Sequence, residues 1–238
     1  MADPAVASLN QPDCRPVAPA WHTFVLLLAL LAISGRGAYS HRAPGLGQTR
    51  GHAIGYVIVI ASEWLLVAFV WFGVRGYRVR LLDLVGGSWS GWKPIRRDLG
   101  IAGGFLLGSN IVLALLGRLL RATPNQAIRN LLPRGGFEVA LYLVLVLTAE
   151  ICEEIIFRGY LQRQFAVLAR SAAAGLVIQG IVFGIAHGYQ GPKYMFIIAV
   201  YGCLFGLLAQ WRHSLRPAMI AHFLQDGIFG IVARHFLK

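Results

Sequence analysis

The sequence predicts an all-α fold, a polytopic transmembrane helix bundle of about seven helices. Hydrophobic residues make up 57% of the 238 residues and charged residues only 13%. Soluble domains carry about 25% charged residues, and the mean hydropathy here is +0.62. Apolar runs of bilayer-spanning length recur along the chain, and basic residues cluster in the loops between them. The length allows one membrane domain.

Each expected helix is an apolar run near the roughly 20 residues that cross a bilayer. The first run is short and resembles the core of a signal peptide, with Ala32-Ile33-Ser34 as a weak cleavage site. Because no cluster of positive charge precedes it, we expect a retained helix. Two later runs are short and interrupted by polar residues, as helices inside a bundle can be. The seven runs are roughly 20–34, 53–74, 99–117, 137–156, 171–189, 193–211 and 217–234.

Three regions are expected along the chain. Residues 1–19 contain several prolines and small residues and are predicted to be a disordered tail. Residues 20–136 hold the N-terminal transmembrane helices and loops. Residues 137–234 hold the core helices that carry the candidate catalytic residues. Glycines recur every fourth residue in three runs, which predicts close helix packing. These are Gly100, Gly104 and Gly108; Gly180, Gly184 and Gly188; and Gly202 and Gly206.

The net charge of +12 points to anionic lipid headgroups as partners. Nucleic acid is not expected, because the chain shows no basic face or base-reading motif. The 75–98 loop holds the densest basic cluster, which predicts that it is cytoplasmic. By alternation the N-terminus also lies in the cytoplasm, in a multi-pass protein of the cell inner (plasma) membrane. The loops on the opposite side also hold arginines, so the difference in positive charge between the two sides is small. Three widely spaced cysteines match neither a metal site nor a disulfide framework.

The placement of the acidic residues points to function. Only 10 residues are acidic, and half of them lie within apolar runs. A charge inside a bilayer costs several kcal/mol unless it is paired or faces a cavity. The five are Glu63, Glu150, Glu153, Glu154 and Asp226.

One helix carries three of these acids. Glu150, Glu153 and Glu154 share one face, although the last two diverge by about 100°. Glu154 and Arg158 are four residues apart with the acid first, the favourable order for an ion pair. We therefore expect Glu154 to be structural and Glu153 to be free to act. A desolvated carboxylate is well suited to be a general base.

Two other apolar runs carry histidines. Phe183 and His187 are four residues apart near the end of one helix, and His222 and Asp226 have the same spacing on another. Alone, each could be a locally satisfied polar group. Three helices that each bring a proton-handling group into the membrane are explained more simply by one shared polar site.

Together the three motifs resemble those of the CPBP family, which comprises CAAX proteases and bacteriocin-processing membrane proteins and is also called the ABI family. The motifs are Glu153-Glu154-x-x-x-Arg158, Phe183-x-x-x-His187 and His222-x-x-x-Asp226. The resemblance covers roughly residues 137–234. The family commonly has Asn, and sometimes Asp, where this chain has Asp226.

The resemblance implies an intramembrane endopeptidase. Glu153 and His187 would hold and activate the water, while His222 and Asp226 would face the scissile carbonyl. His222 could donate to the oxyanion. Asp226 would either serve the oxyanion or orient His222, as a carboxylate orients a triad histidine. Glu154 and Arg158 would lock the helix end.

We favour no metal cofactor. Glu153, His187 and His222 could nevertheless bind zinc or another divalent metal and leave a position open for water. The chain has no His-Glu-x-x-His motif, and these three residues come from three helices.

Two other functions are possible from the residues alone. Buried glutamates and histidines also build the proton relays of coupled transporters, and a bacteriocin-immunity or scaffold protein could keep the fold without activity. Nothing indicates the inverted repeats of transporters, and a scaffold needs no such set of motifs. Glu63 is expected to be neutralised by protonation or by an arginine. The substrate class includes peptides and membrane-protein tails, and the composition resembles that of bacterial membrane proteins.

Overall fold

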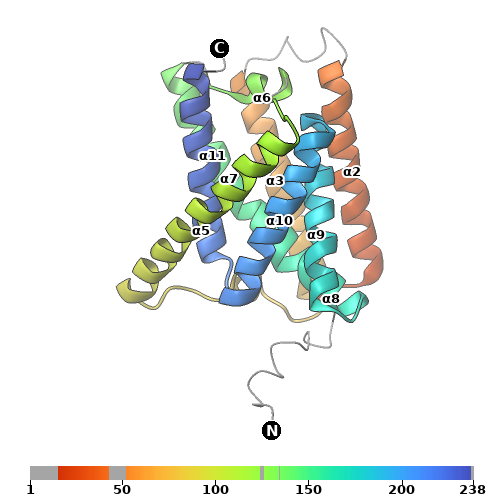
Figure 1. Ribbon diagram of the computed structural model, residues 1–238. Coiled ribbons are helices and arrows are strands. Elements are labelled where there is room, and N and C mark those ends of the chain that lie inside the picture. Colours follow the sequence, from red (N-terminus) through yellow and green to blue (C-terminus); the bar gives the residue numbers. More distant parts are fainter. Residues whose placement is uncertain (1–15, 43–51, 124–125, 134, 237–238) are drawn as a thin grey trace.

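Long helices that run up and down side by side make up the bundle (Figure 1). The computed structural model describes residues 16–42, 52–123, 126–133 and 135–236, and within these residues it contains helices and no strands. The long helices are α2 (Ala20–Arg42), α3 (His52–Arg75), α5 (Trp92–Leu119), α7 (Gly136–Glu153), α9 (Ala172–Ala186), α10 (Pro192–Arg212) and α11 (Arg216–Phe236). They confirm the predicted helix bundle.

Short helical elements connect or extend the long ones. They are α4 (Leu81–Val85), α6 (Gln126–Leu131), the π-helix η1 (Glu154–Leu161), α8 (Gln162–Leu168) and the 3₁₀ turn η2 (Gly188–Gln190). Because η1 and α8 follow α7 without a break, the predicted 137–156 helix continues to Leu168. The first helix extends to Arg42, well past the apolar run 20–34. Most of the predicted tail, residues 1–15, lies outside the described residues.

Four of the described helices are long and apolar enough to cross a membrane. They are α2, α3, α5 and α10. Helix α9 is apolar but has only 15 residues, while α7 and α11 carry acidic residues of the predicted site. The helices that deviate most from simple membrane spans are therefore those expected to carry the chemistry.

Helices α9 and α10 pack closely through glycine. A Cβ at Gly180 or Gly184 would collide with the backbone of α10, so only a hydrogen fits there. The predicted packing role is confirmed for these two. It is wrong for Gly100, Gly104 and Gly108, which face away from the bundle, so a Cβ added at any of them would meet no atom within 4 Å.

The π-helix η1 lies at the centre of the bundle, where all eight of its residues are buried. Tyr160 on η1 joins it to α2 and α3 through His22. The His22 Nε2–H donates to the Phe69 carbonyl oxygen at 2.8 Å, which leaves Nδ1 to accept from the Tyr160 hydroxyl at 2.9 Å. This buried chain fixes η1, and with it the end of α7, against the N-terminal helices.

Candidate active site

The ion pair expected at the start of η1 is present and fully buried. Arg158 Nη1 lies 3.0 Å from Glu154 Oε1. The guanidinium is sandwiched between the rings of Phe183 at 4.3 Å and Phe205 at 5.0 Å. Arg158 Nη2 also donates a long hydrogen bond, 3.5 Å, to the Gly202 carbonyl oxygen. One cation therefore connects η1, α9 and α10.

His222 on α11 is held by carboxylates from α7 and η1. Its Nδ1 hydrogen-bonds to Glu154 Oε1 at 3.1 Å and lies 2.6 Å from Glu150 Oε2. Only Glu154 is in line for an Nδ1–H bond, so Glu150 approaches the nitrogen from the side. Two carboxylates thus fix the ring orientation through Nδ1, as an aspartate does in a catalytic triad.

Glu150 is the site residue to which sequence reasoning gave no role. Its side chain is buried beside His222, since only 5% of it is exposed. The signal was present in the spacing, because Glu150 and Glu154 are four residues apart on the face that meets α11. What the sequence could not show is that a histidine from another helix lies against both.

Glu153 and His187 face each other at the end of α9. The distance from Glu153 Oε1 to His187 Nε2 is 3.9 Å, which is too long for a direct hydrogen bond. Both side chains are partly exposed, at 16% and 17%. His187 Nδ1 lies 2.9 Å from the Phe183 carbonyl oxygen. A carbonyl only accepts, so Nδ1 carries the hydrogen and Nε2 of the neutral ring is an acceptor.

Asp226 lies one helical turn after His222 on α11. Ligand atoms of Glu150, His222 and Asp226 all lie within 4.8 Å of one another. The Asp226 backbone oxygen accepts a hydrogen bond from the Tyr142 hydroxyl at 3.1 Å. Within the described part of the chain, its carboxylate makes no hydrogen bond or ion pair, so it remains available at the site.

Two further residues border this group. Tyr189 in η2 packs near His187, with ring centroids 6.0 Å apart, and its phenol lies within range of the charges of Glu153 and Asp226. Glu63 on α3 interacts with the charge of Glu153. Among the described residues it has no arginine partner, and its neutralisation by protonation or by a loop arginine stays a prediction.

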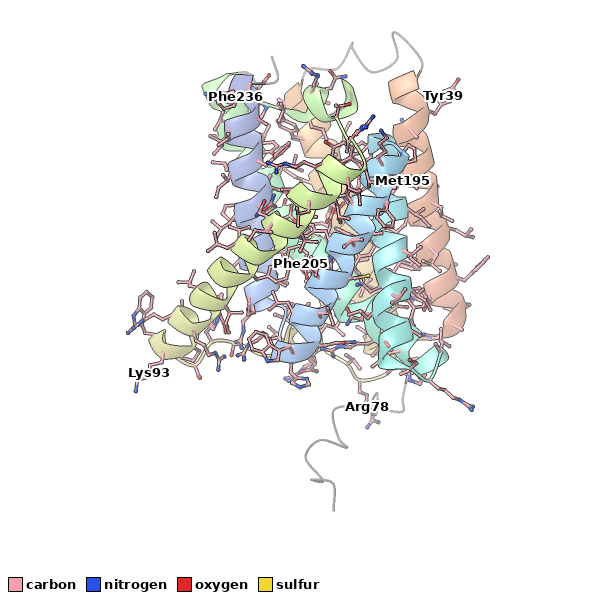
Figure 2. The ribbon with its side chains drawn as sticks, in the orientation of Figure 1. Tyr39, Arg78, Lys93, Met195, Phe205 and Phe236 are labelled. Atoms are coloured by element: carbon pink, nitrogen blue, oxygen red, sulfur yellow. The ribbon has the colours of Figure 1, made fainter. Side chains whose placement is uncertain are left out.

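The part of the site around Arg158 and His222 lies at mid-height of the bundle. Phe205, which packs on both Arg158 and His222, appears there in Figure 2, between Tyr39 and Phe236 at one end and Arg78 and Lys93 at the other. A separate apolar cavity of about 450 Å³ lies between α5 and α11, with Asn110 and Gln225 in its wall. None of the predicted site residues lines that cavity.

The geometry bears on which residues could hold a metal. In the described part of the chain, the ligand atoms that cluster within 4.8 Å belong to Glu150, His222 and Asp226. The alternative set from the sequence, Glu153, His187 and His222, does not form such a cluster. In the observed cluster Nδ1 of His222 is already occupied by carboxylates. A metal bound there through Nδ1 would therefore have to replace that contact.

A family model matches the segment of the chain that carries the three motifs. Residues 135–228 match the family model described as type II CAAX prenyl endopeptidase Rce1-like. No curated protein and no solved structure matches the chain. The matched segment contains all three motifs and every residue of the two carboxylate–histidine groups. Residues 135–228 of this membrane-protein chain therefore form a domain of the CPBP, or CAAX protease, family.

Proposed function

We propose that this protein is an intramembrane endopeptidase that uses Glu153 and His187 to activate a water molecule. The observation that carries the proposal is the pair of facing acceptors. Glu153 Oε1 and His187 Nε2 are 3.9 Å apart, and in a neutral His187 ring the Nδ1 contact leaves Nε2 without a hydrogen. A water between them can donate one O–H to each, which directs its lone pairs outward.

The reaction that follows is addition of this water to a peptide carbonyl. Glu153 takes one proton as the general base, and attack by the oxygen converts the carbonyl into a tetrahedral intermediate. His222, held through Nδ1, presents its Nε2 side to stabilise the oxyanion, and Asp226 lies beside it. The proton held by Glu153 then passes to the leaving amine, so the peptide bond breaks and the base is regenerated.

The role of Asp226 follows from what holds His222. Because Glu154 and Glu150 occupy Nδ1, the orienting carboxylates come from α7 and η1. This favours the oxyanion role for Asp226 over the orienting role. We therefore propose that Asp226 donates a hydrogen bond from its protonated form, where an Asn would donate from its amide.

The setting of the reaction also belongs to this proposal. The substrate is a peptide or the tail of a membrane protein, with the scissile bond near the membrane surface. We place the protein in the cell inner (plasma) membrane with its N-terminus in the cytoplasm, because the 75–98 loop is the most basic. Anionic lipids are proposed as partners and nucleic acid is not. The match to a protease family argues against the transporter alternative, and the complete set of motifs argues against a scaffold.

The test is Glu153→Gln in full-length protein reconstituted in liposomes. The probes are a farnesylated C-a-a-X peptide and a library of single-span transmembrane peptides, with products identified by mass spectrometry. We expect the variant to cleave about 10²–10⁴-fold more slowly, the usual contribution of general acid–base catalysis. Glu138→Gln, a change of the same type at the start of α7, is the control and should retain wild-type rates.

Two results would contradict the proposal. Cleavage by Glu153→Gln near the wild-type rate would exclude Glu153 as the base. Equal loss in Glu138→Gln would show that removal of an α7 carboxylate acts through folding and not through the water.

A further inference from the structure

The ends of three helices meet around one buried carboxylate, far along the chain from the proposed catalytic base. Asp98 near the start of α5 is only 1% exposed. Trp89 donates its indole N–H to Asp98 Oδ2 at 2.9 Å. Arg97 lies beside it on α5, Arg212 ends α10, and Arg216 begins α11.

Three cations share this single anion. The guanidinium nitrogens of Arg97, Arg216 and Arg212 lie 3.2, 3.5 and 3.9 Å from the Asp98 oxygens. One carboxylate neutralises one of the three charges, so the cluster keeps a net charge of +2. Charges this close in a partly buried position repel one another unless an anion joins them.

The cluster also has more donors than acceptors. Each guanidinium carries five N–H donors, and Asp98 offers two oxygens. Arg212 Nε and Arg216 Nη1 are buried and have no acceptor within the described part of the chain. The outer part of the cluster is open, because Arg97 is 53% exposed. The protein therefore leaves room and N–H donors for an anion with several oxygens.

The aromatic neighbours place the cluster at the level of lipid headgroups. Trp92 and Trp211 are 66% and 65% exposed. Arg212 lies over the Trp211 ring at 5.2 Å, and Arg216 lies over the Trp89 ring at 5.5 Å. Tryptophan is enriched where a membrane protein meets the bilayer interface. This end of the bundle is also the end marked by Arg78 and Lys93 (Figure 2).

We propose that Arg97, Arg212 and Arg216 bind the phosphate of an anionic phospholipid headgroup at this end of the bundle. Guanidinium groups bind phosphate oxygens in a bidentate manner, and the exposed indoles contact the glycerol and upper acyl region. The net charge of +2 selects lipids with net negative charge over zwitterionic ones. The site joins α5, α10 and α11, and it does not depend on the proposed proteolysis.

The test measures lipid binding to purified full-length protein in detergent. Native mass spectrometry counts bound phosphatidylglycerol, and thermal shift gives its affinity. An arginine near a membrane surface contributes about 1 kcal/mol, or about fivefold in affinity. We expect Arg212→Gln with Arg216→Gln to weaken binding about 25-fold. Arg97→Gln alone should weaken lipid binding about fivefold. This single variant tests the proposal if the double variant fails to fold.

The matched control removes the same charge at the same end. Arg78 and Arg170 are exposed, and Arg78→Gln with Arg170→Gln should leave the affinity for phosphatidylglycerol unchanged. Equal weakening in the control would show that the affinity depends on overall charge alone, and it would refute the proposed site. Phosphatidylcholine that binds as tightly as phosphatidylglycerol would also overturn it. Displacement of the lipid by millimolar inorganic phosphate would identify a free-anion site and refute the lipid assignment.

Discussion

Removing Glu154 should destabilise the protein more than removing Arg158. Arg158 has one carboxylate partner, so Glu154→Gln leaves a cation at a fully buried position with no anion beside it, only the rings of Phe183 and Phe205 and the long contact to the Gly202 carbonyl oxygen. Breaking one side of a buried ion pair costs about 3–5 kcal/mol. Arg158→Met leaves Glu154 with His222 as a remaining partner. We therefore expect a smaller loss, about 1–3 kcal/mol, the cost of an unsatisfied buried group.

Thermal unfolding in detergent measures this difference. For a chain of this size, 3–5 kcal/mol corresponds to about 6–20 °C in Tm for Glu154→Gln. The double variant, which leaves neither charge, should recover part of the loss. Arg80→Gln, which breaks an exposed ion pair 2.8 Å long in the same protein, is the control and should change Tm little. Wild-type Tm in Glu154→Gln, or a double variant worse than both singles, would refute this account.

Four other predictions concern the site and its surroundings. Asp226→Asn should at least match wild-type cleavage, because the amide N–H can donate to the oxyanion; a rate below that of the wild type would show that Asp226 orients His222. Glu150→Gln should lower kcat about 10–100-fold with little change in KM, the usual effect of losing an outer-shell partner, and an unchanged kcat would remove Glu150 from the site. Chelation with phenanthroline should leave cleavage unchanged, whereas stoichiometric zinc lost together with activity would overturn this expectation. The hydrogen bond from Arg80 holds the pKa of the Asp83 carboxyl below its usual value, so the stability it adds is present above about pH 4 and lost as pH falls through the folded pKa; the difference in Tm between wild type and Asp83→Asn should therefore shrink in acid.

The sequence was sufficient for the helices and for contacts within one helix. Apolar runs of bilayer length predicted the seven long helices, and the spacing of Glu154 and Arg158 predicted their ion pair, because both depend on local periodicity. The residues that share a site across helices were grouped by their rarity in apolar runs and by the resemblance to a family. Local spacing alone could not have brought His187 and His222 together.

What the sequence could not specify is which acid meets which histidine. Glu150, Glu153 and Glu154 share a helical face by periodicity, so any of them could have faced α11 or α9. In the structure Glu153 lies opposite His187, while Glu150 and Glu154 lie against His222. That assignment depends on how α9 and α11 pack around α7. The sequence also did not show that Gly100, Gly104 and Gly108 face away from the bundle. Glycines at every fourth residue of a helix do not indicate whether another helix packs against them.

The π-helix after Glu153 makes the site sensitive to chain length in a way that point substitutions do not reveal. A π-turn closes i→i+5 hydrogen bonds and holds more residues than an α-turn. Deleting one of the two adjacent isoleucines, Ile155 or Ile156, from Glu154–Leu161 would favour α-helical geometry. The segment would still contain an isoleucine and all of its other buried side chains. Because each residue turns the chain by less in a π-helix than in an α-helix, the deletion would also change the rotation of α7 relative to α8. The acids of α7 would then lose their present alignment with the two histidines, so insertions and deletions in this segment should be far less tolerated than conservative replacements at the same positions.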